Sequence, residues 1–337
     1  MAVNPADGTV FVGTRGSKVF AVSDRNRDGV ADPVGELAPA LSLNTPNGVC
    51  FAADGSLFVV ELNRVLNFAA AELALGRADP VASVVVPQGQ LIPVSEESRN
   101  HSARACAVGP DGRLYIAIGQ PYNVPPPQKA ELYWRWGIGG IVRFRREGSE
   151  REVYARGVRN SVGLAFNPKD GSLWFTDNQV DGMGDDIPPG ELNRATRAGQ
   201  HFGFPWYGGG RVRTTEYLGS VPPADALFPE VEMDAHAADL GLMFYRGSQF
   251  PLRYRGGIFS AQHGSWNRTE PIGARVMFTP LRSDGTAGAP EVFAAGWLTA
   301  RGDYLGRPVD VQELGDGSIL VSDDFAGAIY RISYRAP

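Results

Sequence analysis

A tight turn followed by a strand of alternating apolar and polar residues recurs six times along the chain. Each turn contains an Asp-Gly or Gly-Gly pair, which supplies the positive φ angles that a two-residue β-hairpin needs. The six copies are ADGTVFVGT at 6–14, ADGSLFVVE at 53–61, PDGRLYIAIG at 110–119, KDGSLWFTD at 169–177, RGGIFSAQH at 255–263 and GDGSILVSD at 315–323. A period of two residues predicts half-buried strands rather than helices.

Further strands flank the copies. A second strand follows each copy, another precedes most of them, and segments 82–86 and 291–294 have the pattern of outer strands. The turns are marked by Asp7, Asp54, Asp111, Asp170, Gly256 and Asp316, so successive units lie 47 to 86 residues apart. Six antiparallel sheets in tandem predict an all-β fold, a six-bladed β-propeller with mostly four-stranded antiparallel blades.

The two ends of the chain bear on how the ring closes. A strand stub at 2–3 already opens the first unit, so we expect a single propeller domain over 1–337 whose N-terminal segment is truncated. The sixth unit supplies strands only at 309–313, 318–322 and 328–334, which predicts an incomplete last blade of three strands. Segment 69–75 is the one stretch that reads as a helix, and it is short.

Composition excludes some classes of partner. The net charge of −5 and the lack of a basic run argue against nucleic acid. No apolar stretch approaches the roughly 20 residues that span a bilayer, so we expect no membrane-spanning segment. Cys50 and Cys106 both lie in apolar, strand-like segments. The favoured interpretation is that the two cysteines are separate, small, buried hydrophobic residues, and a disulfide between them is the alternative.

One loop has the oxygen pattern of a calcium site. Positions 1, 3, 5 and 9 of an EF-hand-like loop are occupied by Asp24, Asn26, Asp28 and Asp32, with glycine at position 6. Position 12 is Gly35 in place of a glutamate and no helices flank the loop, so a polar hairpin is the alternative. Three carboxylates this close repel each other unless a cation or water separates them, which favours calcium.

Several imidazole and guanidinium groups lie where a strand meets a long loop. Three histidines occupy such junctions, and two arginines directly precede inner strands near the propeller axis. These residues are His101, His236, His263, Arg159 (followed by Asn160) and Arg307. A charge near the axis is costly unless an opposite charge meets it, so we expect either salt bridges between blades or an anionic ligand at one end of the axis.

Five segments carry a family resemblance. They are GVRNSVGLAFNPKDGSLWFTDN, GDDIPPGELNRATRAGQHFGFPW, QHGSWNR, LGRPVDV and SILVSDDFAGAIYRISYR. With these segments the chain resembles the pyrroloquinoline quinone (PQQ)-dependent glucose/sorbosone dehydrogenase family, and most of all its sorbosone and pyranose dehydrogenase branch. The resemblance runs from about residue 7 to the C-terminus. The loop at 119–138 departs from the family, as does Val309, which stands where glucose dehydrogenases have a second arginine.

The resemblance implies a quinoprotein that oxidises a sugar hydroxyl or hydrated aldehyde, with hydride transfer to calcium-bound PQQ. His101 matches the general base, and Arg159 matches a group that polarises the quinone carbonyl together with calcium. The other implied cofactor contacts are Arg104, Asn160, His263, Arg268 and Arg307. Gln179 and Val180 match the loop at 178–180 whose backbone carbonyls hold the calcium ion beside the quinone.

The same resemblance implies a sugar or sugar-aldehyde substrate, an external electron acceptor, and a periplasmic or secreted location, although no signal-peptide order opens the chain. Two other functions would use the same fold. One is a calcium-dependent lactonase or other hydrolase, which needs a carboxylate-rich metal site on the axis. The other is a non-catalytic propeller that binds a ligand or partner.

Overall fold

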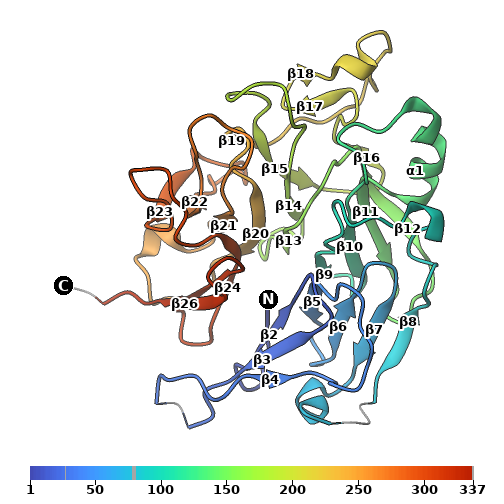
Figure 1. Cartoon of the computed structure of the whole chain (residues 1–337). Helices are drawn as coiled ribbons and strands as arrows, with labels where there is room; N and C mark the ends of the chain where they lie inside the picture. The colour runs from blue at the N-terminus through green and yellow to red at the C-terminus, as the bar shows by residue number, and fades with distance from the viewer. Residues whose placement is uncertain (27, 78–80, 336–337) are drawn as a thin grey trace.

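A ring of six small antiparallel sheets makes up the computed structural model, which describes residues 1–26, 28–77 and 81–335 (Figure 1). The ring is a six-bladed β-propeller, as the repeat predicts. Blade one contains β1 (Ala2–Val3), β2 (Val10–Gly13), β3 (Val19–Val22) and β4 (Gly35–Glu36). Blade two contains β5 (Gly48–Phe51), β6 (Leu57–Val60), β7 (Val65–Phe68) and β8 (Ser83–Val86).

The remaining blades continue the same order around the ring. Blade three contains β9 (Cys106–Val108), β10 (Leu114–Ile118), β11 (Gly140–Phe144), β12 (Glu152–Arg156) and, parallel to β12, β16 (Gln200–His201). Blade four contains β13 (Leu164–Phe166), β14 (Leu173–Asp177), β15 (Gly190–Ala195) and β19 (Val231–Met233). Blade five contains β20 (Asp239–Phe244), β21 (Ile258–Gln262), β22 (Arg275–Thr279) and β23 (Glu291–Ala294). Blade six contains β24 (Pro308–Glu313), β25 (Ile319–Asp323) and β26 (Ala328–Ile332), the three strands expected of it. A separate hairpin joins β17 (Tyr207–Gly209) to β18 (Val212–Arg213).

Helical structure is confined to short segments between strands. The predicted helix at 69–75 is a 3₁₀ turn, η1 (Ala71–Ala74). The other 3₁₀ turns are η2 (Val94–Glu96), η3 (Pro127–Lys129), η4 (Thr215–Tyr217) and η5 (Leu252–Tyr254). The α-helix α1 (Ala130–Trp136) was not predicted, because its stability comes from distant contacts: Tyr133 donates a hydrogen bond to Glu96 at 3.0 Å. No helix in the described part of the chain has the length and apolarity to cross a bilayer.

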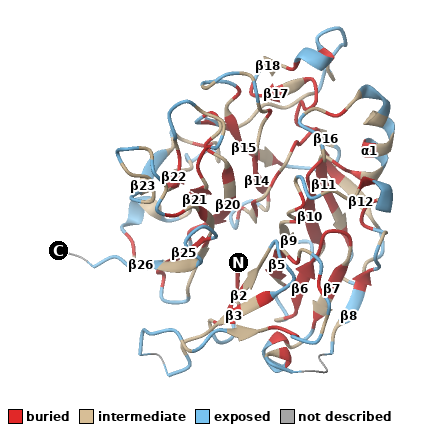
Figure 2. Cartoon of the chain, viewed as in Figure 1, coloured by how far each residue is buried: buried red, intermediate tan, exposed pale blue. Residues whose placement is uncertain are grey.

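The core lies between the blades. Phe58, Ile116 and Val142 belong to one buried cluster shared by blades two and three. Tyr115 and Phe175 belong to the next cluster, shared by blades three and four. Figure 2 shows the buried residues along the strands and the exposed residues on the outer loops. Each blade therefore depends on its neighbours to bury its apolar faces.

Glycines at the start of the inner strands or directly before them let neighbouring blades approach closely at the axis. A Cβ atom at Gly48 would lie 1.8 Å from the carbonyl oxygen of Arg104 on the next blade. A Cβ atom at Gly163 would lie 2.2 Å from the carbonyl oxygen of Leu240, again on the next blade. Since no side chain fits at these contacts, glycine is required there for close packing and not for turn geometry.

A disulfide joins Cys50 of β5 to Cys106 of β9, with 5.8 Å between their Cα atoms. The favoured interpretation of these cysteines as separate hydrophobic residues is therefore wrong. The two inner strands pack beside each other around the axis. Because Cys50 and Cys106 occupy similar positions in consecutive blades, the ring brings them together although 56 residues separate them in the chain.

Candidate functional site

Acidic residues that end the second strand of a blade hold the backbone just before the inner strand of the same blade. Asp177, which ends β14, accepts hydrogen bonds from the backbone N–H groups of Arg159 at 2.9 Å and Asn160 at 2.7 Å. Asp323, which ends β25, accepts one from the N–H of Arg307 at 2.8 Å. Burial raises the pKa of Asp177, and its bonds to N–H groups oppose that rise. These acids therefore fix the points from which the two candidate arginines project.

His101 is held as a neutral imidazole of defined tautomer. Its Nδ1 atom lies 2.5 Å from the carbonyl oxygen of Gln120. A carbonyl oxygen only accepts, so Nδ1 donates and Nε2 keeps its free electron pair. Burial, and secondly the positive charge of Arg159, lower the pKa of His101 to about 4. A neutral imidazole with a free Nε2 is the form that a general base requires.

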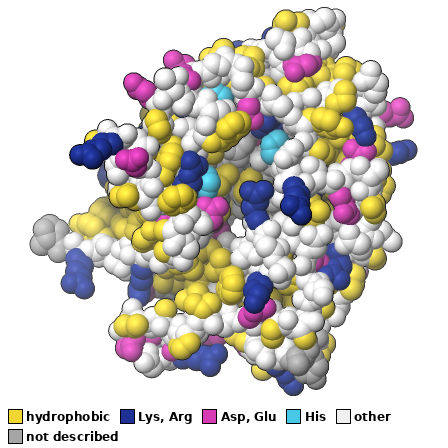
Figure 3. Space-filling view, in the orientation of Figure 1, with side chains coloured by type: hydrophobic (Ala, Val, Ile, Leu, Met, Phe, Trp, Pro, Cys, Tyr) yellow, Lys and Arg dark blue, Asp and Glu magenta, His cyan; other side chains and the backbone are white. Residues whose placement is uncertain are grey.

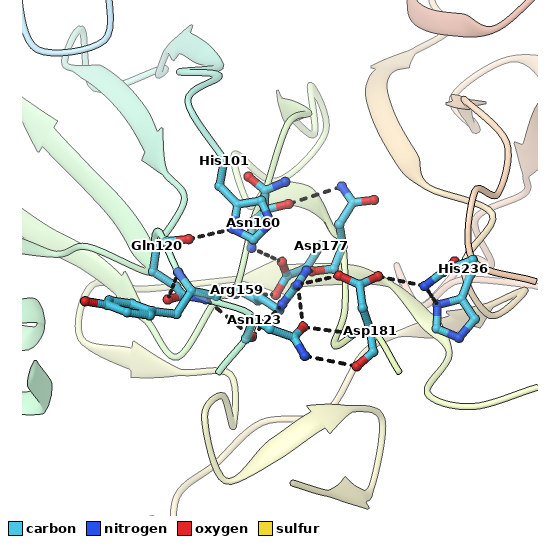
Figure 4. A network of polar contacts seen from close by, with 11 residues as sticks. His101, Gln120, Asn123, Arg159, Asn160, Asp177, Asp181 and His236 are labelled. Atoms are coloured by element: carbon cyan, nitrogen blue, oxygen red, sulfur yellow. Dashed lines mark hydrogen bonds and ion pairs between the residues drawn. The ribbon is translucent and has the colours of Figure 1, made fainter. Parts of the chain in front are cut away.

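Arg159 lies beside His101 in a buried polar network (Figure 4). Only 2% of Arg159 is exposed. Its guanidinium donates to the carbonyl oxygen of Asn178 at 3.1 Å and to the carboxylate of Asp181 at 2.9 Å. Burial lowers the pKa of Arg159, and the charges of Asp181 and Asp177 oppose that effect. Arg159 is therefore a buried cation with a half-buried carboxylate as its ion-pair partner.

The network continues from blade four to blade five through Asn267. The Asn267 side chain donates to the Asp181 carboxylate at 2.8 Å and lies 3.2 Å from Nδ1 of His236. Nε2 of His236 lies 2.8 Å from the carbonyl oxygen of Gly184. Because that carbonyl accepts, His236 carries its proton on Nε2 and accepts from Asn267 at Nδ1. The loops after β14 and β21 are therefore tied together.

His263, which begins the loop that contains Asn267, forms a second cluster with Arg307, which directly precedes β24. Nε2 of His263 lies 2.8 Å from the Asp324 carboxylate, and Nδ1 lies 3.4 Å from the Arg307 guanidinium. Arg307 also donates to the carbonyl oxygens of Gly264 at 3.1 Å and Ser265 at 3.0 Å. The loop that follows His263 thus connects this cluster to Asp181 and Arg159. Figure 3 shows histidine and cationic side chains around the hollowed centre of one face.

Arg104 and Arg268 contact protein groups in this structure. Arg104 is 2% exposed and donates to the carbonyl oxygens of Leu62 at 3.1 Å and His101 at 2.8 Å, and burial lowers its pKa to about 10. It therefore supports the backbone of His101. Arg268 pairs with the Asp186 carboxylate at 3.1 Å and donates to the Asp185 carbonyl oxygen. The cofactor contacts that the resemblance implies for both arginines remain predictions.

Three buried amide oxygens in the network are without a hydrogen-bond partner among the described residues. They are Oδ1 of Asn160, Oε1 of Gln179 and Oδ1 of Asn267. An unpaired buried oxygen is costly, and an amide oxygen is a ligand that Ca²⁺ accepts. Val180 is buried beside Gln179, and its N–H donates to the carbonyl oxygen of Gly208 at 2.9 Å. The resemblance implies backbone carbonyls of this loop as calcium ligands, which stays a prediction, and Oε1 of Gln179 is an unpaired side-chain oxygen in the same loop.

The loop at 24–32 lies away from this network, at the outer edge of blade one between β3 and β4 (Figure 1). Asp24 accepts hydrogen bonds from the N–H groups of Asp28 at 3.1 Å and Gly29 at 2.9 Å. Asp32 accepts from Ser23 and from the N–H of Arg25, and Asn26 donates to Asp28.

Residue 27 of this loop lies outside the described residues. Over 1–26, 28–77 and 81–335, no three His, Cys, Asp or Glu side chains are grouped to hold a metal ion. Backbone N–H groups thus compensate these carboxylates, and calcium here remains a prediction.

Gln120, Asn123, Asp181 and Asn267 of the network were not singled out from the sequence. Gln120 and Asn123 lie in the loop at 119–138, and Asp181 lies in the loop after β14. Their contacts join different blades, so neither the repeat nor a local motif signals them. The aspartates that end β14 and β25 could have been found from the repeat, because an Asp is the last residue of both KDGSLWFTD and GDGSILVSD.

Comparisons with known proteins agree with this architecture. The model of the glucose/sorbosone dehydrogenase family matches residues 50–265. An uncharacterized protein of Borreliella burgdorferi is 38% identical over 241 residues, which cover 71% of this chain and 62% of that protein. An aldose sugar dehydrogenase of Escherichia coli is 25% identical over 256 residues, which cover 70% of this chain and 61% of that protein. The matched regions thus span about three fifths of the length of these relatives.

Solved structures share the fold at lower sequence identity. The PQQ domain of a pyranose dehydrogenase from Coprinopsis cinerea superposes with a TM-score of 0.74 at 17% identity, over 98% of this chain and 91% of that one. The PQQ-bound form of an aldose sugar dehydrogenase from Streptomyces coelicolor superposes with a TM-score of 0.64 at 19% identity, over 97% of this chain and 88% of that one. These likenesses support the propeller fold. Because the family model covers well over half of the sequence, the chain belongs to the glucose/sorbosone dehydrogenase family.

Proposed function

We propose that this protein is a PQQ-dependent dehydrogenase that oxidises a sugar hydroxyl or hydrated aldehyde. The observation that carries the proposal is the neutral His101, whose free Nε2 lies in the same network as the buried cation Arg159. A neutral imidazole can remove a hydroxyl proton as a general base. A fixed positive charge beside it stabilises the negative charge that develops during the reaction. Membership of the family and the names of the relatives support the same activity.

The residues present fit PQQ, which is an ortho-quinone with several carboxylates. Arg159 and Arg307 would supply positive charge to it, and the unpaired Oδ1 of Asn160 and the imidazole of His263 offer further polar contacts. PQQ supplies a two-electron acceptor for the hydride that leaves the sugar carbon. His101 would hold the hydroxyl proton on Nε2, while its Nδ1–H bond to Gln120 keeps the ring in place.

Calcium beside the cofactor belongs to the same proposal. The free Oε1 of Gln179 supports it, because it offers one oxygen ligand that protein groups leave unpaired. Sorbosone-like sugars as substrates rest on the family resemblance alone. A periplasmic or secreted location is supported by the disulfide between Cys50 and Cys106, since such bonds persist mainly in oxidising compartments.

The test is a PQQ titration followed by absorbance in the presence of calcium, and then a screen of sugars with an artificial electron acceptor. We expect saturable PQQ binding and dye reduction. The variant His101→Ala should lose dye reduction but still bind PQQ, because a general base acts on the transition state more than on cofactor affinity. His201→Ala, which removes another buried histidine, serves as the control and should retain turnover per folded molecule. A hydrolase or a non-catalytic propeller would give no dye reduction.

A further inference from the structure

Asn123 covers the buried guanidinium of Arg159. The carbonyl oxygen of Asn123 accepts a hydrogen bond from Nε of Arg159 at 2.9 Å, and its Oδ1 accepts one from Nη2 at 2.8 Å. Asn123 itself is exposed, whereas Arg159 is 2% exposed. Asn123 therefore lies between the arginine and solvent and contacts two of its three nitrogens.

Asn123 also binds Asp181, the carboxylate partner of Arg159. The N–H of Asp181 donates to Oδ1 of Asn123 at 2.9 Å, and Nδ2 of Asn123 donates to the carbonyl oxygen of Asp181 at 2.9 Å. The Asp181 carboxylate accepts from Arg159 at 2.9 Å. The three residues thus form a closed set of contacts in which each touches the other two, as Figure 4 shows.

These contacts leave Arg159 little freedom. Its guanidinium has five N–H bonds. Nε donates to the backbone carbonyl oxygen of Asn123, and Nη1 donates one bond to the backbone carbonyl oxygen of Asn178. Nη2 donates one bond to Oδ1 of Asn123 and one to the Asp181 carboxylate. One N–H of Nη1 remains for a ligand, so its direction is set by the bonds that hold the other four. Without the Asn123 side chain, Arg159 would lose the bond from Nη2 to Oδ1, and Asp181 would lose both of its bonds to that side chain. The Nε bond to the backbone carbonyl of residue 123 would remain, so the Nη2 end of the guanidinium and its carboxylate partner are the parts that would be released.

We propose that Asn123 is a positioning residue for the oxidation reaction, which acts by holding Arg159 and its partner Asp181 in one geometry. This inference rests on the proposed function in that Arg159 is taken to act on the cofactor. Asn123 comes from the loop at 119–138, the segment that departs from the family pattern. That loop therefore contributes to the site through Arg159 and is more than a surface insertion.

Arginine NMR tests the contact itself without cofactor or turnover. In the wild-type protein the Nη2–H signals of Arg159, assigned by their loss in Arg159→Lys, should exchange slowly with solvent, because Nη2 donates to Oδ1 of Asn123 and to Asp181. In Asn123→Ala that exchange should become faster by on the order of tenfold or more, the effect of losing a hydrogen bond to a charged group. Glu131→Ala, an exposed residue of the same loop, is the control and should leave the exchange rate unchanged. Unchanged exchange in Asn123→Ala would overturn the proposal.

A double-mutant cycle then tests whether Asn123 acts through Arg159. We expect Asn123→Ala to lower kcat/KM for dye reduction on the order of tenfold, with the melting temperature close to that of Glu131→Ala. If Asn123 acts through Arg159, the double variant with Arg159→Lys should be no worse than Arg159→Lys alone. Additive losses would contradict the positioning role. A wild-type protein that binds no PQQ and reduces no dye would instead refute the proposed function, while the exchange result would still stand.

Discussion

His101 should stay uncharged well below neutral pH. Burial and the Arg159 charge lower its pKa from 6.5 to about 4. One pKa unit corresponds to about 1.4 kcal/mol, so protonation costs about 3 kcal/mol more here than in an exposed imidazole. At pH 5.5 an exposed histidine would be about 90% protonated, but His101 only about 3%. The imidazole therefore remains available as a base over a wide acid range.

Proton NMR of the four histidines in the cofactor-free protein measures this directly, with the His101 signal assigned by its loss in His101→Ala. We expect a midpoint near pH 4. Replacing Arg159 with methionine should raise that midpoint, because a positive charge disfavours the imidazolium. The midpoint should still lie below 6.5, since burial is the larger cause. A wild-type midpoint near 6.5, or a lower midpoint in Arg159→Met, would refute the reasoning.

Three further predictions concern stability. Replacing both Cys50 and Cys106 with alanine should lower the unfolding free energy by about 4 kcal/mol, the chain-entropy value for their separation of 56 residues; an unchanged urea midpoint would contradict this. Burial and the Asp177 charge raise the pKa of Glu191 to about 8, so the folded state holds its proton more tightly than the unfolded state. Wild-type stability should therefore fall as pH rises from about 5 to 8, and this part of the fall should be missing in Glu191→Gln, as urea titrations at several pH values would show. If the loop at 24–32 binds calcium, chelation should lower the melting temperature of the cofactor-free wild-type protein but not that of Asp28→Asn; equal effects would leave the loop as a polar turn.

The blades were predictable because their hairpins depend on local chemistry. In the turns at Asp54, Asp170 and Asp316, each carboxylate accepts hydrogen bonds from both the N–H and the hydroxyl of the serine two residues later. Every group in such a turn lies within a few residues, so the sequence pattern contains the whole interaction. The outer strands expected at 82–86 and 291–294 are likewise present as β8 and β23.

Contacts between blades were not predictable in the same way. Asn123 and Asp181 are 58 residues apart, and their contact depends on how blades three and four are placed side by side. The disulfide depends on the same kind of placement. It could have been inferred by aligning the repeats, since Cys50 lies four residues before Asp54 and Cys106 five residues before Asp111. Such an alignment compares positions within units, whereas the isolated segments show only two apolar strands.

The contact at Gly48 has a consequence for how loss of function would be distributed along the sequence. The missing Cβ of Gly48 leaves room for the carbonyl oxygen of Arg104, the residue that also supports the backbone of His101. An alanine at position 48 would push this carbonyl away and so displace the histidine, although Gly48 has no chemistry of its own. A random mutational screen for inactive variants should therefore recover inner-strand glycines together with the polar residues of the site. The sensitive positions would trace a circle around the axis instead of a single patch.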